Sequence, residues 1–350
     1  MPNVDSHQHF WRYTEKDYGW IGEEDKVLKR DFLPEELLAT LTSNKIDACV
    51  AVQARQSLIE SDWLLQLAQQ HTFIAGVVGW IDLKSADVEQ QLKEYKKRKA
   101  LKGFRHVLQD ETDPNFMLDR DFVRGLRLLA KYNFTYDLLI YSHQLPQAIK
   151  LLELVPELQV VIDHIAKPNI ATCRDFDRWK SAMSSMADHG NVYCKVSGMV
   201  TEANPKDWEA KDFKPYLDVI FSAYGSDRVM FGSDWPVCLL GGSYSDIKND
   251  CIDILHVLDG KSLRNCVLSV KKENVKEAKK RDVEISKGAA EIQFDRTEFQ
   301  FGTVNEGDVV EAKFVVINSG KTDLIITKVQ PSCGCTVPEW PRTPIKPGES

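Results

Sequence analysis

Two histidines, His7 and His9, are separated by a single residue near the amino terminus of the chain. If residues 3–9 form a β-strand, side chains two positions apart point to the same side, so both imidazoles project together near the strand's end. Two imidazole rings in this arrangement can bind one metal ion. Taken alone, the His-x-His sequence is best explained as a chance occurrence or as a pair of hydrogen-bonded core histidines. Its interpretation therefore depends on which other residues lie near the two rings.

Two further residues, His164 and Asp234, follow β-rich segments and have side chains that bind metals or transfer protons. A carboxylate such as Asp234 can take a proton from water and later return it to a leaving alkoxide, which makes it the candidate general base. Arg105 carries a positive charge that suits a developing oxyanion or an anionic group of a substrate. We therefore predict Asp234, His164 and Arg105 as catalytic residues.

Polar or aromatic residues at the ends of other predicted strands are candidates for binding a substrate: Gln53, Trp80, His106, Lys195 and Trp235. Some of them have an ordinary structural interpretation as well. His106 can be a hydrogen-bonded loop histidine, Lys195 the partner of a buried carboxylate, and Trp235 a packing residue. In a pocket, the indole rings of Trp80 and Trp235 would instead line an apolar floor for a bound ligand.

The elements that position these residues alternate regularly between β-rich runs and segments with helical periodicity. The predicted strands cover residues 3–9, 46–53, 73–81, 101–107, 134–141, 158–165, 191–196 and 228–231. The predicted helices cover residues 33–43, 57–71, 88–99, 119–132, 145–154, 176–188, 213–223 and 245–258.

This alternation predicts parallel strands joined by crossover helices, which leaves a doubly wound sheet or a closed barrel. Eight units in about 250 residues, with no glycine-rich phosphate loop after the first strand, favour a (β/α)8 TIM-like barrel. In such a barrel the chemistry lies at the carboxyl ends of the strands. The candidate residues all lie at or just after the carboxyl ends of predicted strands, so we expect them to meet at one mouth.

The chain of 350 residues is long enough for one large domain and a small one. A dense charge run covers residues 271–284, and the pattern beyond it becomes all-β, with turn sequences between short strands. We predict a barrel over residues 1–265, a charged linker over 266–289 and a partial β domain over 290–350. Four strands before the end of the chain are fewer than a complete immunoglobulin-like sandwich needs.

Charge and hydropathy limit the partners of the protein. The net charge of −7 and the lack of a basic cluster disfavour nucleic acid. No apolar run approaches the roughly 20 residues of a membrane span, and the first predicted strand follows Met1 without a signal peptide. We expect a cytoplasmic protein that acts on a small molecule; the pattern does not predict an oligomeric state.

Four stretches resemble the amidohydrolase superfamily, specifically its branch of sugar-lactone hydrolases: Asp5–Trp11, Gly103–His106, Val161–Pro168 and Phe231–Pro236. The resemblance implies metal ligands at His7, His9, His164 and Asp234, with one divalent ion such as zinc or manganese. The superfamily often places a carboxylated lysine or a glutamate after strand four. This chain has Arg105 and His106 there, so we do not expect a binuclear centre. Some relatives resemble hydrolases without any metal, which leaves a metal-independent site as the alternative.

The resemblance further implies that the protein opens a small sugar lactone by attack of water, with Asp234 as general base. A decarboxylase of the same fold and a non-catalytic sugar-acid binding protein are the alternatives. The carboxyl-terminal segment resembles a bacterial immunoglobulin-like family of unknown function through the stretch Cys333–Pro338. A natural fusion and a truncated domain both remain open for this segment.

Overall fold

The computed structural model describes residues 2–249, 292–294, 315–318, 343, 345–347 and 349. Contacts within the chain divide it into two units, Met1–Leu268 and Ser269–Ser350. The first contains all of the predicted site residues.

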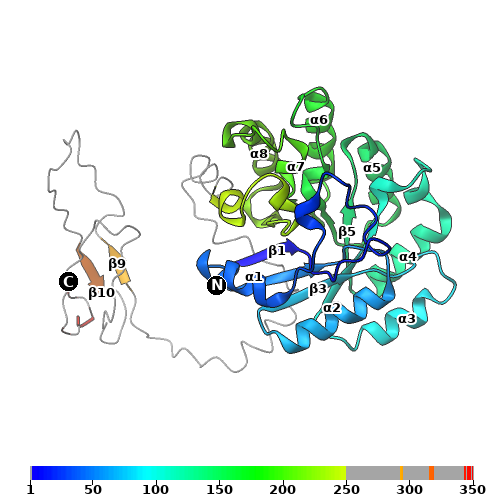
Figure 1. Ribbon diagram of the computed structural model, residues 1–350. Coiled ribbons are helices and arrows are strands. Elements are labelled where there is room, and N and C mark those ends of the chain that lie inside the picture. The colour runs from blue at the N-terminus through cyan, green and yellow to red at the C-terminus, as the bar shows by residue number, and fades with distance from the viewer. Residues whose placement is uncertain are drawn as a thin grey trace. The chain divides into compact units, whose positions relative to one another are not determined.

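Eight parallel strands form a single sheet in which each strand pairs with the next one along the chain (Figure 1). The strands are β1 (Val4–Gln8), β2 (Ala48–Val52), β3 (Ile74–Gly79), β4 (Leu101–Val107), β5 (Thr135–Leu139), β6 (Val160–Ile162), β7 (Val192–Val196) and β8 (Val229–Phe231). An isolated parallel bridge between Gln8 and Trp235 links β1 to the segment after β8. The sheet is therefore a nearly closed barrel, and the eight parallel strands predicted from the sequence are confirmed.

Helices surround the strands on the outside of the barrel (Figure 1). They are α1 (Pro34–Ser43), α2 (Leu58–Gln70), α3 (Val88–Tyr95), α4 (Arg120–Lys131), α5 (Leu145–Leu154), α6 (Phe176–Ala187), α7 (Met199–Glu202) and α8 (Ala210–Tyr224). Residues 244–249 are also helical. The short helix α7 and several 3-10 turns are not among the predicted elements.

Local sequence signals explain where several helices begin. Pro34 occupies the first turn of α1, where its missing N–H costs no helical hydrogen bond. The Ser57 hydroxyl accepts the N–H of Ile59 at the start of α2, at 3.2 Å. The Asp119 carboxylate accepts two backbone N–H groups in the first turn of α4.

Apolar side chains form a large core between the barrel strands and the helices. Trp179 of α6 and Tyr216 of α8, for example, are fully buried with ring centroids 5.0 Å apart. A separate small cluster contains Val50, Val52 and Val78. Because side chains alternate along a strand, Val50 and Val52 point to the opposite face from their neighbours in the large core, into the barrel. The interior is thus apolar near β2 and β3.

The second unit contains two described strands, β9 (Ile292–Phe294) and β10 (Val316–Asn318), which pair antiparallel. The predicted linker and most of the predicted immunoglobulin-like strands lie outside the described residues. Within the described residues, no helix is both long enough and apolar enough to cross a bilayer.

Candidate active site

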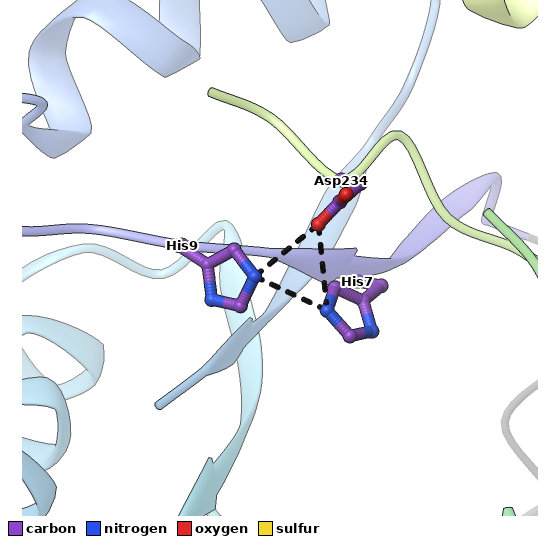
Figure 2. A group of neighbouring side chains, drawn as sticks. All are labelled: His7, His9 and Asp234. Carbon is purple, nitrogen blue, oxygen red and sulfur yellow. Dashed lines mark hydrogen bonds and ion pairs between the residues drawn. The ribbon is translucent and has the colours of Figure 1, made fainter. Parts of the chain in front are cut away.

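Three side chains converge at the carboxyl end of β1 (Figure 2). Nε2 of His7 and Nε2 of His9 are 3.2 Å apart, and Oδ1 of Asp234 lies 3.7 Å from the first and 3.3 Å from the second. All three residues are buried. The strand periodicity that predicted a shared direction for the two histidines therefore describes their arrangement, and the segment after β8 adds the carboxylate.

A hydrogen bond sets the tautomer of His9, whereas Nδ1 of His7 faces both a donor and an acceptor. The carbonyl oxygen of Val52 can only accept, so Nδ1 of His9, 2.8 Å away, carries the proton. Arg105 can only donate, and its Nη1 lies 3.3 Å from Nε2 of His7, while Oδ1 of Asp163 lies 3.3 Å from Nδ1 of the same ring. Nε2 of neutral His9 therefore keeps its lone pair. Nδ1 of His7 also lies 3.3 Å from the ammonium of Lys195, which only donates, so the contacts of His7 do not select one tautomer.

His164 approaches the same carboxylate from the end of β6. Its Nε2 lies 3.9 Å from Oδ1 of Asp234, and its Nδ1 is 2.9 Å from the hydroxyl of Ser197. A Cβ atom on Gly198 would come within 2.5 Å of the His164 ring, and Gly198 has a φ of +61°. Glycine is the residue that tolerates both conditions, so Gly198 lets the imidazole occupy this position.

A buried carboxylate in β1 holds the segment that carries Asp234. Oδ1 of Asp5 accepts the backbone N–H groups of Ser233 at 2.9 Å and His7 at 3.1 Å. Its Oδ2 accepts the hydroxyls of Ser233 at 2.6 Å and Tyr244 at 3.0 Å. Asp234 follows directly with a φ of +58°, a conformation that costs free energy outside glycine. Asp5 thus fixes the backbone on both sides of the site.

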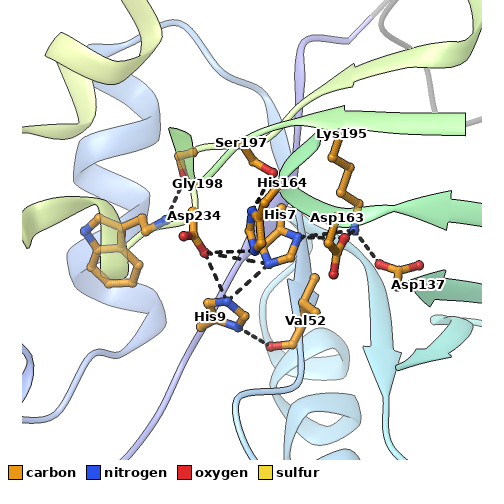
Figure 3. Close-up of polar contacts among 12 residues, drawn as sticks. His7, His9, Val52, Asp137, Asp163, His164, Lys195, Ser197, Gly198 and Asp234 are labelled. Atoms are coloured by element: carbon orange, nitrogen blue, oxygen red, sulfur yellow. Dashed lines mark hydrogen bonds and ion pairs between the residues drawn. The ribbon is translucent and has the colours of Figure 1, made fainter. Parts of the chain in front are cut away.

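Charged side chains lie beside His7 (Figure 3). Nζ of Lys195 contacts Oδ2 of Asp137, Oδ1 of Asp163 at 3.0 Å and Nδ1 of His7 at 3.3 Å. Nη1 of Arg105 lies 3.1 Å from Oδ2 of Asp163. Two cations and two carboxylates therefore compensate one another where water is excluded, which offsets the cost of burying each charge.

The surroundings shift the pKa values of the ionisable groups. Burial lowers the pKa of His7 well below its usual value, and it lowers the pKa of His164 to about 4. Burial raises the pKa of Asp234, but its interactions with the imidazoles of His164, His9 and His7 favour the ionised form and hold the pKa below the usual range. Near neutral pH, His7 and His164 are therefore unprotonated and Asp234 is ionised.

The predicted substrate-binding residues lie in different surroundings. Gln53 and Trp235 are buried, and Gln53 donates to the carbonyl oxygen of Arg105 at 3.3 Å. Nε1 of Trp80 donates to Nδ1 of His106 at 3.4 Å, and Nε2 of His106 lies 2.7 Å from Glu111. Their role toward a substrate stays a prediction.

The surroundings of Lys195 agree with its structural interpretation as the partner of a buried carboxylate. It is 3% exposed, and its three donors face Asp137, Asp163 and His7. An ammonium has three N–H groups, so none is left for a substrate in this arrangement. The geometry favours a role in holding His7 over the predicted contact with substrate.

Residues 4–269, which include every site residue above, match the amidohydrolase family. The chain belongs to this family. The resemblance seen in the sequence motifs is therefore confirmed. Residues 292–350 of this amidohydrolase match a second family, a protein of unknown function (DUF1573), as the carboxyl-terminal motif predicted.

Similar proteins include two lactonases and a solved structure. An L-fucono-1,5-lactonase of Burkholderia multivorans is 41% identical over 261 residues, which cover 70% of this chain and 86% of that protein. An L-rhamnono-gamma-lactonase of Scheffersomyces stipitis is 29% identical over 185 residues, 45% of this chain and 54% of that one. The crystal structure of a Burkholderia multivorans amidohydrolase with bound zinc superposes with a TM-score of 0.73 at 38% identity, covering 76% of this chain and 96% of that chain.

Three carboxylates in the site of this amidohydrolase, Asp5, Asp137 and Asp163, are absent from the residues predicted to act there. The sequence contains one indication of Asp137, because it is a charged residue within an otherwise apolar predicted strand. A charged residue in such a strand is seldom buried without a partner. Asp5 lies two residues before His7, and Asp163 directly precedes His164. These positions in the sequence do not indicate that each carboxylate would accept several hydrogen bonds or form several ion pairs.

The lowered pKa of His164 predicts an acid-sensitive fold. The folded-state pKa of about 4 lies below the unfolded value of 6.5, so the unfolded chain binds the proton first as the pH falls. The free energy of unfolding of metal-stripped protein is expected to drop by about 3 kcal/mol between pH 6.5 and 4 through this residue. Urea titrations of the wild type and of His164→Gln check this, since the variant must show a shallower decline. Parallel declines would contradict the assignment.

Proposed function

We propose that this protein hydrolyses the lactone of a small sugar acid, with Asp234 as the general base and a single divalent ion at His7, His9 and Asp234. The convergence of these three buried side chains at the mouth of the barrel carries the proposal. The lactonases among its relatives support the substrate class, and they suggest the 1,5-lactone and the γ-lactone of a 6-deoxy sugar acid as first compounds to test.

The donor set fits one divalent ion. Tetrahedral ligands at zinc bond lengths of about 2.0–2.1 Å are separated from one another by roughly 3.4 Å. The separations among His7, His9 and Asp234 are 3.2, 3.3 and 3.7 Å. His164, with Nε2 3.9 Å from the same carboxylate oxygen, could join them. When bound, such an ion supplies a Lewis acid for the lactone carbonyl and for water.

The second group of potential ligands, His7, Asp163 and His164, does not fit an additional ion. Both oxygens of Asp163 face cations, with Lys195 at 3.0 Å and Arg105 at 3.1 Å. A metal ion bound to Asp163 would lie beside these two positive charges, which disfavours it. We infer a mononuclear centre, as the replacement of the usual strand-four ligand by Arg105 also suggests.

The chain's own residues account for the proton transfers. Oδ1 of Asp234 faces the histidines, and Oδ2 has no hydrogen-bond partner among residues 2–249, so this oxygen is free to accept a proton from water. As the tetrahedral intermediate collapses, Asp234 returns the proton to the ring oxygen that leaves. Arg105, whose Nη1 lies 3.3 Å from Nε2 of His7, is the cation we assign to stabilise negative charge on the former carbonyl oxygen.

A pH-indicator assay with L-fucono-1,5-lactone tests this proposal. Opening of the lactone gives an acid that ionises and releases a proton, whereas decarboxylation of a carboxylate substrate consumes one. Steady acid release that scales with protein concentration is the expected result. Binding without acid release would instead favour a sugar-acid binding protein, and carbon dioxide evolution from an aromatic acid would favour a decarboxylase.

The carboxyl-terminal segment is predicted to be dispensable for this activity. Every proposed site residue precedes residue 249 and belongs to the unit formed by residues 1–268. A shortened chain ending at Lys271 is expected to keep kcat/KM within a few-fold of the full chain. A loss of several orders of magnitude with an unchanged circular dichroism spectrum would place part of the segment in the site.

A further inference from the structure

Four consecutive residues after β6 adopt the left-handed conformation. The φ values are 54° for His164, 48° for Ile165, 60° for Ala166 and 44° for Lys167. None of the four residues is glycine. For a residue other than glycine, the left-handed conformation costs roughly 1–2 kcal/mol of conformational free energy. Conformations of this kind persist where surrounding contacts enforce them, and they concentrate at functional sites.

Contacts with the core determine which side chains of this run face the mouth of the barrel. The carbonyl oxygen of Ile165 accepts the indole N–H of Trp179 at 2.7 Å, and the side chains of Ile165 and Ala166 are fully buried. Residues three apart in a tight turn lie on the same side, and the N–H of Lys167 donates to the carbonyl oxygen of His164 at 2.8 Å. The strained run therefore directs Lys167 to the same side as His164.

Lys167 faces Glu202, the last residue of α7, across a short gap. Nζ of Lys167 and Oε1 of Glu202 are 3.8 Å apart, which is beyond hydrogen-bond distance. The two side chains are 16% and 17% exposed, and neither makes a side-chain hydrogen bond within the described part of the chain. Two half-buried charges with unused hydrogen-bonding capacity carry a desolvation cost that a ligand can relieve.

Glu202 also lies near the proposed catalytic carboxylate. Burial raises the pKa of Glu202, Lys167 opposes that rise, and the charge of Asp234 adds to it. The N–H of Ala171 donates to the carbonyl oxygen of Glu202 at 3.0 Å, which ties the loop after β6 to α7. The charged pair is thus held between the segment after β6, which carries His164, and α7, which follows Gly198 beside the His164 ring.

We propose that Lys167 and Glu202 bind one hydroxyl group of the sugar lactone between them and thereby select polyhydroxylated lactones over plain ones. A hydroxyl oxygen at roughly 2.8 Å from both charged groups fits a 3.8 Å gap, since it accepts from the ammonium and donates to the carboxylate. This subsite rests on the proposed lactonase function. It adds the two residues that would distinguish substrates by their hydroxyl groups.

The test compares kcat/KM for L-fucono-1,5-lactone with kcat/KM for δ-valerolactone, which has no hydroxyl groups. The ratio of the two values measures hydroxyl selection. Lys167→Met and Glu202→Gln are each expected to lower this ratio by about 10- to 100-fold, because each removes a charge-assisted hydrogen bond. The double variant is expected to lose little more than the worse single variant, since both side chains bind the same group.

A matched control is the exposed pair Lys97 and Glu94 of the α3 region, which are 2.6 Å apart. Lys97→Met and Glu94→Gln are expected to leave the ratio unchanged. Lys167→Arg keeps the charge and is expected to retain part of the selectivity, which provides a folded variant if Lys167→Met is unstable.

Three outcomes separate the possibilities. A lowered ratio in the single variants with melting temperatures near the wild type supports the subsite. An unchanged ratio in an active enzyme overturns it and leaves the lactonase proposal intact, and the pair is then a structural ion pair. A wild-type protein that hydrolyses neither lactone overturns the proposed function and the subsite together.

Discussion

Replacement of Asp234 by asparagine is expected to lower kcat for lactone hydrolysis by about 10²- to 10⁴-fold, the usual effect of losing a general base. The amide has nearly the same shape, so the backbone held by Asp5 and the contacts of the histidine rings are expected to persist. An amide oxygen cannot accept and return a proton as a carboxylate does. Stopped-flow or pH-indicator assays on purified protein measure the change.

Asp246→Asn is the matched control for this experiment. Asp246 belongs to the same stretch after β8, but it is exposed, and its carboxylate accepts the backbone N–H of Ser243 at 2.8 Å. The control is expected to keep wild-type kcat. An Asp234→Asn protein that also kept it would remove the base role, and the convergence of the three ligands would then require another explanation.

The sequence predicts the barrel because its signals are local. Alternation of apolar residues and helical periodicity depend on each segment alone, so the predicted strand over residues 101–107 coincides with β4 and the predicted helix over 145–154 coincides with α5. The shared direction of His7 and His9 is predictable for the same reason, because two side chains two residues apart on one strand point to the same side.

The sequence fails where distant segments override local preference. The β-branched run that predicts a strand over residues 158–165 ends as β6 at Ile162, because Trp179 of α6 and the packing of Ile165 hold the next residues in a left-handed turn. The partnership of Asp137 with Lys195 joins β5 to β7 across the barrel. The residues next to Asp137 and Lys195 in the sequence do not indicate this contact. The sequence therefore does not predict which carboxylates pair with the cations beside His7.

Metal content decides between the two forms of the site that the sequence left open. If His7 and His9 are ligands, wild-type protein loaded with zinc and dialysed is expected to retain about one equivalent, the occupancy of a single site. His7→Ala and His9→Ala are each expected to retain far less, since each removes one of the three close donors. Mutations of outer partners of a metal commonly cost about 10- to 100-fold in affinity or activity, so loss of a direct ligand is expected to lower kcat at least about 100-fold.

His71→Ala provides the matched control, because His71 lies at the end of α2 and its ring is 3.9 Å from Glu35. This variant is expected to keep both the metal and the activity. Unchanged stoichiometry in His7→Ala and His9→Ala would identify the pair as hydrogen-bonded core histidines. A wild-type protein that hydrolyses the lactone at full rate after chelation, with no bound metal, would instead establish the metal-independent site. In that case His7 and His9 would act only as neighbours that line the position of Asp234, at the 3.7 and 3.3 Å separations of their Nε2 atoms from its Oδ1.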